Sequence, residues 1–118
     1  YKELGTGGGL QQQFYELGSQ INTFVQTTNF LRKNNRFDEL AIYMHNNQGL
    51  MNVKGQVRAT EKYLSYWRQR RDRLYLREDL DQKQKRAMMK DLILERDQRL
   101  IFVPELIKRS KQQDYANR

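Results

Sequence analysis

The chain has 118 residues, of which 37% are hydrophobic and 31% charged, with a mean hydropathy of −1.00. This length fits one domain or part of one, and the composition is too polar for a self-sufficient core and too patterned for plain disorder. The chain has no Cys, which excludes disulfides, thiolate metal sites and a Cys nucleophile, and no apolar run approaches the ~20 residues of a membrane-spanning helix.

The net charge of +8 is unevenly distributed along the chain. Residues 1–50 hold four basic and four acidic residues, so residues 51–118 carry all of the excess, with 18 basic residues and 10 acidic ones. A neutral first half and a basic second half indicate two surfaces with different roles. The basic half is either a solvated surface or one that attracts an anionic partner.

Residues 1–9, YKELGTGGG, contain four of the seven glycines. Glycine disfavours helix and strand alike, so this segment is predicted to be a flexible linker. No GK[ST] follows it, which argues against a phosphate-binding loop. The start at Tyr1, without a Met and leading directly into the glycines, indicates that the chain is an excerpt from a much longer protein.

Apolar residues within 10–31 recur at alternating spacings of four and three. This 3.5-residue repeat predicts a long helix that packs in a coiled-coil-like seam. The helix should end near residues 33–35, where Lys33 suits the helix dipole and Asn35 tolerates a left-handed cap. The seam consists of Leu10, Phe14, Leu17, Ile21, Phe24, Thr28 and Leu31, widened by Val25 and Phe30.

Residues 38–47 predict a short second helix that stops at a turn over NNQG. Asp38 is expected at its N-cap or in its first turn. The single histidine, His45, lacks the partners that a catalytic or metal-binding role needs, so a surface or packing position is expected.

Two further helices are predicted over residues 50–77 and 82–103. A capping box of Asp81 and Gln84 opens the last one, and Pro104 should kink or restart it. Residues 105–111 suit one or two more amphipathic turns, and residues 110–118 form a basic, polar tail. The apolar faces contain Leu50, Val53, Val57, Thr60, Leu64, Trp67, Arg71 and Leu74 in the third helix, and Met88, Met89, Leu92, Ile93, Leu100 and Val103, interrupted by Arg96, in the fourth.

No segment alternates with a period of two, so the sequence predicts an all-α fold of about four helices, in the order long, short, long, long. The helical domain spans residues 10–109 and forms a bundle or hairpin within a larger assembly. The tight link between the third and fourth helices predicts that they are antiparallel neighbours.

The most unusual stretch is 63–77, YLSYWRQRRDRLYLR, with the only Trp and five arginines. At 100° per residue, three of the arginines lie within about 60° of one another beside a tyrosine. We call this set the arginine strip. Guanidinium groups bind phosphates, and aromatic rings stack on bases, but the same pattern describes a protein interface, which we favour. The arginine strip consists of Tyr66, Arg70, Arg73 and Arg77.

Within one turn of sequence, Arg68 can pair with Asp72, and Arg99 with Glu95. One His, no Cys and no HExxH or GxSxG motif leave only carboxylates, each explained as a helix-surface or cap residue. We therefore expect no catalysis, cofactor, metal or small-molecule substrate in this chain. Surplus aromatic residues are expected to serve partners, namely Tyr43, Tyr63, Tyr66, Tyr75 and Phe102.

The order of the helices carries a family resemblance. It begins with FYELGSQINTFVQTTNFLRKNNRFDELAIYMHNNQGLM, continues with VRATEKYLSYWRQRRDRL and ends with the capped, lysine-rich LDQKQKRAMMKDLILERDQRLI. In this pattern, residues 10–109 resemble the C-terminal helical region of internal virion (core or ejection) proteins of short-tailed phages, and related helical regions of phage large polyvalent proteins. The likeness rests on helical pattern and contains no invariant catalytic motif.

The resemblance implies a structural virion protein, stored inside the capsid above the portal and ejected to help form a DNA conduit through the cell envelope. Its implied partners are other internal virion proteins, the portal, neighbouring copies of itself and packaged double-stranded DNA. A lytic transglycosylase domain can lie elsewhere in such proteins, but no residue here matches its motif. Two alternatives remain: a nucleic-acid-binding helical module using the arginine strip, and a tape-measure or scaffolding coiled coil.

Overall fold

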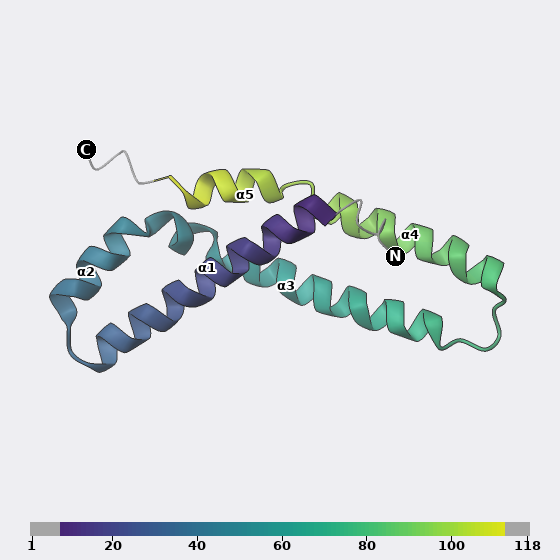
Figure 1. The fold of residues 1–118 in the computed structure, drawn as a ribbon, viewed down its shortest axis with the longest axis horizontal. Coiled ribbons are helices and arrows are strands. Elements are labelled where there is room, and N and C mark those ends of the chain that lie inside the picture. The colour runs from purple at the N-terminus through teal and green to yellow at the C-terminus, as the bar shows by residue number, and fades with distance from the viewer. Residues whose placement is uncertain (1–7, 113–118) are drawn as a thin grey trace.

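The computed structural model describes residues 8–112, which form five helices joined by short connections (Figure 1). No strand occurs among these residues, so the prediction of an all-α fold is confirmed. Of the predicted linker over residues 1–9, only Gly8 and Gly9 lie in the described part, and they belong to the first helix. The predicted tail lies outside the described residues from position 113 onward. The helices are α1 (Gly8–Lys33), α2 (Phe37–Asn46), α3 (Gln48–Tyr75), α4 (Gln82–Leu100) and α5 (Val103–Ser110).

The fifth helix is the result of the restart predicted at Pro104. α4 ends at Leu100 rather than at residue 103, and α5 begins after Ile101 and Phe102. Proline in the first turn of a helix removes an N–H that has no intrahelical partner, so Pro104 costs α5 no hydrogen bond. The residues after the proline therefore form a separate helix rather than one or two loose turns.

The turn between α1 and α2 is a Schellman motif. Asn35 has a positive φ of 57°, as the sequence predicted for a left-handed cap. The backbone N–H of Arg36 donates to the carbonyl of Leu31 (2.9 Å), and that of Asn35 donates to the carbonyl of Arg32 (3.1 Å). These bonds satisfy the last carbonyls of α1 and reverse the chain, so that α2 packs back against α1 (Figure 1).

The junction between α2 and α3 is a single residue. Asn47 is at once the C-cap of α2 and the N-cap of α3, so the turn predicted over NNQG is reduced to one position. Gly49 in the first turn of α3 is buried, and a Cβ added there would lie 2.1 Å from the backbone oxygen of Ser110 in α5. Only glycine permits helices to approach so closely at this point.

The helices form two antiparallel hairpins that extend in opposite directions from a central crossing (Figure 1). α1 and α2 make one hairpin, α3 and α4 make the other, and α5 packs on both α1 and α3 where they cross. The predicted antiparallel pairing of the third and fourth helices is confirmed. The buried cluster at the crossing, which we call the crossing core, contains Phe14, Leu17, Ile21, Val53, Val57, Leu64, Leu100, Val103 and Leu106.

A second and smaller cluster, the hairpin core, joins α3 to α4 beyond the crossing and contains Trp67, Leu74, Met89 and Leu92. The predicted apolar faces of α1 and α3 are largely confirmed. In α1, all residues of the predicted seam from Phe14 to Leu31 are buried, and in α3 six of the eight predicted residues are buried. Phe30, predicted to widen the first seam, is instead exposed. Arg96, predicted to interrupt the face of α4, is itself buried.

The described part of the chain is long and thin, with extents of 61 × 29 × 19 Å. Its radius of gyration is 18.7 Å, whereas a compact domain of this length has one of about 13 Å. Each hairpin is a single layer of two helices, so much of its surface has no second layer to cover it. α2, for example, contains no buried residue at all.

Two glycine substitutions in α3 test the close packing at the crossing. Gly49→Ala should lower the free energy of unfolding by about 2–3 kcal/mol, because the new methyl group overlaps the backbone of α5. Gly55→Ala, in the same helix, should raise it by about 1 kcal/mol, because nothing lies within 4 Å of a Cβ there and alanine favours helix. Urea unfolding followed by circular dichroism measures both, and equal effects of the two substitutions would contradict the packing described.

Candidate interaction surfaces

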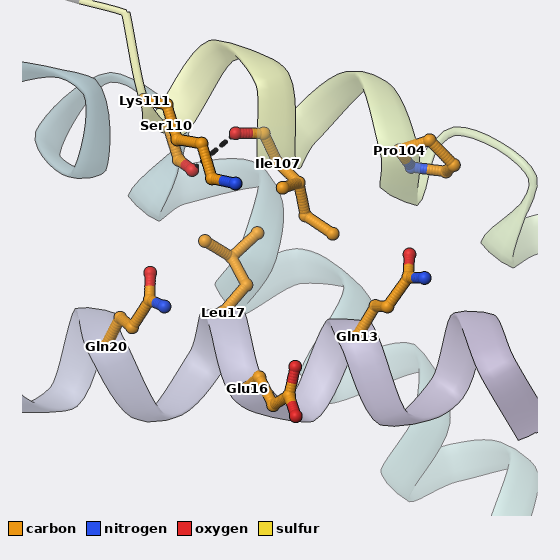
Figure 2. A pocket seen from close by; sticks show the side chains of 8 residues that line it. All are labelled: Gln13, Glu16, Leu17, Gln20, Pro104, Ile107, Ser110 and Lys111. Atoms are coloured by element: carbon orange, nitrogen blue, oxygen red, sulfur yellow. Dashed lines mark hydrogen bonds between the residues drawn. The ribbon is translucent and has the colours of Figure 1, made fainter.

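A cleft between α1 and α5 is a candidate site for ligand binding or catalysis (Figure 2). It has a volume of 380 Å³, and Figure 2 shows Leu17 pointing across it toward Ile107. Its ionisable lining groups are Glu16 and Lys111, and the hydroxyl of Ser110 donates to the carbonyl of Ile107 in its own helix (2.7 Å). These groups form no nucleophile–base pair, and the cleft is a partly filled seam between two packed helices.

Within residues 8–112 there is no cluster of three or more His, Cys, Asp or Glu side chains able to hold a metal ion. In the same part of the chain, no helix combines the length and apolar character required to cross a bilayer. Three further concave surfaces lie along α3 and α4.

The structure brings the three arginines of the arginine strip together. Arg70, Arg73 and Arg77 line one groove of 410 Å³, which also includes residues of α4. Tyr66 is 54% exposed one turn before them, and the guanidinium carbon of Arg70 lies 5.3 Å from the centre of its ring. Because α3 ends at Tyr75, Arg77 follows the helix instead of lying within it as predicted.

Arg70 is held by a carboxylate from the opposite helix. Its two terminal nitrogens donate to the two oxygens of Glu95 in α4, at 2.7 and 3.1 Å, and the hydroxyl of Tyr63 donates to Glu95 at 2.5 Å. The guanidinium of Arg99 lies 4.9 Å from the centre of the Tyr63 ring. We call these four residues the hairpin network.

The hairpin network changes the titration of its members. The hydrogen bonds from Arg70 and then from Tyr63 lower the pKa of Glu95, because they favour its charged form. The pKa of Tyr63 is raised, mainly because its hydroxyl is partly buried and also because it donates a hydrogen bond to Glu95. The sequence predicted that Glu95 pairs with Arg99, and this prediction is wrong, because Glu95 accepts from Arg70 and Tyr63. Arg70 fastens α3 to α4.

The other two arginines of the strip differ in their surroundings. Arg77 donates to both oxygens of Asp79 (2.9 and 2.6 Å), and this hydrogen bonding lowers the pKa of Asp79 to about 2. Both side chains are exposed, so the pair belongs to the surface of the turn. Within residues 8–112, no carboxylate forms an ion pair with Arg73.

Most of the other features of residues 63–77 also serve the fold. Trp67 is only 2% exposed, and its indole N–H donates to the carbonyl of Leu92 (2.7 Å). The guanidinium carbons of Arg71 and Arg96 lie 5.7 and 5.0 Å from the centre of a Trp67 ring. The stretch that the sequence singled out therefore has one buried side, formed by Leu64, Trp67 and Leu74, that closes the helical hairpin, while most of its other residues are exposed.

Further contacts correct the predictions for the neighbouring side chains. Arg68, expected to pair with Asp72, donates instead to the hydroxyl of Tyr15 in α1 (3.2 Å), while Asp72 accepts from Arg71. Of the five aromatic residues assigned to partners, four have side-chain contacts within residues 8–112, and that of Tyr66 is with Arg70. Tyr43 stacks on Phe24, Tyr63 binds Glu95 and Phe102 packs on the crossing core, whereas Tyr66 and Tyr75 are exposed.

A second groove, which the sequence did not predict, lies between the end of α3 and the first half of α4. It has a volume of 720 Å³ and we call it the basic groove. The sequence does contain an indication of a basic surface here, because residues 82–90, QKQKRAMMK, include four basic residues and no acidic one. Among the residues that line it are Tyr75, Lys83, Lys85, Arg86, Met89, Lys90 and Ile93.

Comparison of the chain with protein-family models, with curated proteins and with solved structures gives no match. The geometry of the described residues is therefore the basis for a functional proposal, together with the resemblance in sequence.

A double-mutant cycle tests the hairpin network. Arg70→Ala, Glu95→Ala and the double variant should reveal a coupling of about 1 kcal/mol in the free energy of unfolding, because the bidentate pair is 31% and 42% exposed and partly screened by water. The same cycle on the exposed Arg36–Glu39 pair should give only a few tenths of a kcal/mol.

The coupling should also depend on pH. The folded-state pKa of Glu95 lies below its ordinary value of 4.5, so the carboxylate contributes its full stabilisation above pH 4.5. That contribution should be lost progressively as the pH falls below 4.5 and the carboxyl group is protonated. Urea unfolding at several pH values measures this change, and a coupling that is constant from neutral to acid pH would contradict it.

Proposed function

We propose that this chain is a structural helical module that docks onto other protein chains within a larger assembly. The observation that carries this proposal is the open, single-layer architecture, with a radius of gyration of 18.7 Å and large apolar side chains left in water. Exposed apolar surface is unfavourable for an isolated chain and is typical of surfaces that partners cover. On the α1–α2 hairpin, Ile42 is 62% exposed, Phe37 56% and Phe30 54%.

The setting that we propose is the one implied by the resemblance in sequence, the interior of a phage virion. There the module would bind other internal core proteins, the portal or neighbouring copies of itself, and would support ejection of the genome into the host. The support for this setting is the helical pattern of residues 10–109, and the support for a docking role is the exposed apolar surface.

The contacts of the arginines favour protein over DNA as the partner. Arg70 and Arg77 are each engaged by a carboxylate of the same chain, which reduces the charge that they present to phosphates. The seams of α1 and α3 are filled by helices of the same chain, so they do not offer the continuous surface that a tape-measure or scaffolding coiled coil needs. Docking through the outer surfaces of the hairpins is therefore the function we favour.

Sedimentation velocity of the chain, alone and mixed with the virion proteins encoded beside it, tests the docking role. We expect either self-association or a complex with a core or portal protein. The double variant Phe37→Ser/Ile42→Ser should weaken that complex at least tenfold with little loss of stability, because both side chains are exposed. A chain that remains a monomer in every mixture would contradict the proposal.

The matched control is Leu94→Ser/Ile101→Ser. These two apolar side chains are also exposed, but they lie on or just after α4 rather than on α2. An equal effect of both double variants would show that general hydrophobicity, rather than the α1–α2 hairpin, drives the association.

A further inference from the structure

The basic groove has charges on both sides of an apolar floor. Met89 and Ile93 are one turn apart on α4, and Arg86 continues their line by one turn toward the start of the helix. At about 100° per residue, Lys83 and Lys90 lie on one side of this line and Lys85 on the other. The exposed ring of Tyr75, at the end of α3, extends the apolar surface.

The placement of these charges is unfavourable for α4 by itself. Lys83, Lys85 and Arg86 lie in the first turns of the helix, where the helix dipole favours negative charge, and the first turn contains no acidic residue. Lys83 and Arg86 are also three residues apart, and Arg86 and Lys90 four, which are spacings at which like charges repel. Within residues 8–112, Lys83, Arg86 and Lys90 form no ion pair that would offset this cost, so an anionic partner is the natural counterpart.

Contacts within the chain leave most of this charge unmatched. Lys85 donates to the carbonyl of Tyr75 (2.9 Å) and so completes the end of α3. Within residues 8–112, no carboxylate forms an ion pair with Lys83, Arg86 or Lys90. These three cations are therefore the groups that a partner would meet.

We propose that the basic groove binds an acidic amphipathic helix of another protein chain. Apolar side chains one turn apart on that helix would contact Ile93, Tyr75 and the small exposed part of Met89, which is otherwise buried in the hairpin core. Flanking Asp or Glu side chains would pair with Lys83, Arg86 and Lys90. A nucleic-acid backbone would satisfy the cations but would set phosphates against the apolar floor, which a helix with an apolar stripe covers. This inference rests on the proposed docking role and names the chemistry of one partner.

The direct test measures binding of labelled synthetic peptides to the 118-residue chain by fluorescence anisotropy. The first peptide has Leu at helical i, i+4 spacing flanked by Glu, and is about 18 residues long because shorter helices are marginal in water. The second has the same Glu residues but Gln in place of Leu. We expect the first peptide to bind at least tenfold more tightly than the second, and more weakly as the salt concentration rises.

Charge reversal locates the site. K83E/R86E/K90E should weaken binding of the first peptide at least tenfold, and neutralisation by K83Q/R86Q/K90Q should give an intermediate loss. The matched control K54E/R58E/K62E, which makes the same change of charge on α3 away from the groove, should bind as the parent chain does. Circular dichroism verifies that all three variants keep their helix content.

Other outcomes would overturn the proposal. One is equal affinity for the two peptides, and another is an equal loss of affinity in the two charge-reversal variants. A third is tighter binding of a 20-base-pair DNA duplex (about two turns) than of the first peptide, if K83E/R86E/K90E removes that duplex binding. If the chain sediments in a complex with a virion protein that K83E/R86E/K90E leaves intact, the docking role stands and the basic groove is not its site. If no complex forms at all, the docking role itself fails.

Discussion

The packing of α5 on the crossing of α1 and α3 is the constraint on which the rest of the structure depends. The crossing core draws its nine buried residues from α1, α3 and α5 and from the end of α4. Burial of such side chains contributes roughly 1.5–3 kcal/mol each, so this cluster is the main source of stability in a chain with little other core. Gly49 is part of the same constraint, because it lets the start of α3 lie against the backbone of α5.

Beyond the crossing, each hairpin is held by different means. The α1–α2 hairpin depends on the Schellman turn at Asn35 and on a few contacts such as the stacking of Tyr43 on Phe24 (5.6 Å between ring centres). The α3–α4 hairpin has its own small core and, on its surface, the hairpin network of Tyr63, Arg70, Glu95 and Arg99. Polar contacts thus replace the apolar layer that a compact bundle would have placed there.

The sequence predicted the helices well, because local signals define them. The heptad spacing of α1, the left-handed Asn35, the capping box at Asp81 and the restart at Pro104 all act within a few residues of the chain. The partner of Arg70 could not be found in this way, because Glu95 is 25 residues away and lies beside it only after α4 has folded back. The basic groove was missed for the same reason, because its charges and most of its floor lie on α4, and only the folded hairpin places Tyr75 of α3 beside them.

The separation of the two buried clusters has a consequence for how the molecule opens. The crossing core has nine buried residues and the hairpin core only four, so the outer part of the α3–α4 hairpin should open more often than the crossing. Backbone amides near the tip of this hairpin would then exchange with solvent faster than those at the crossing. A chain bound there would slow this exchange, because it adds its binding free energy to the closed form. The end of the molecule that carries the basic groove is thus also an end whose local stability a bound partner can raise.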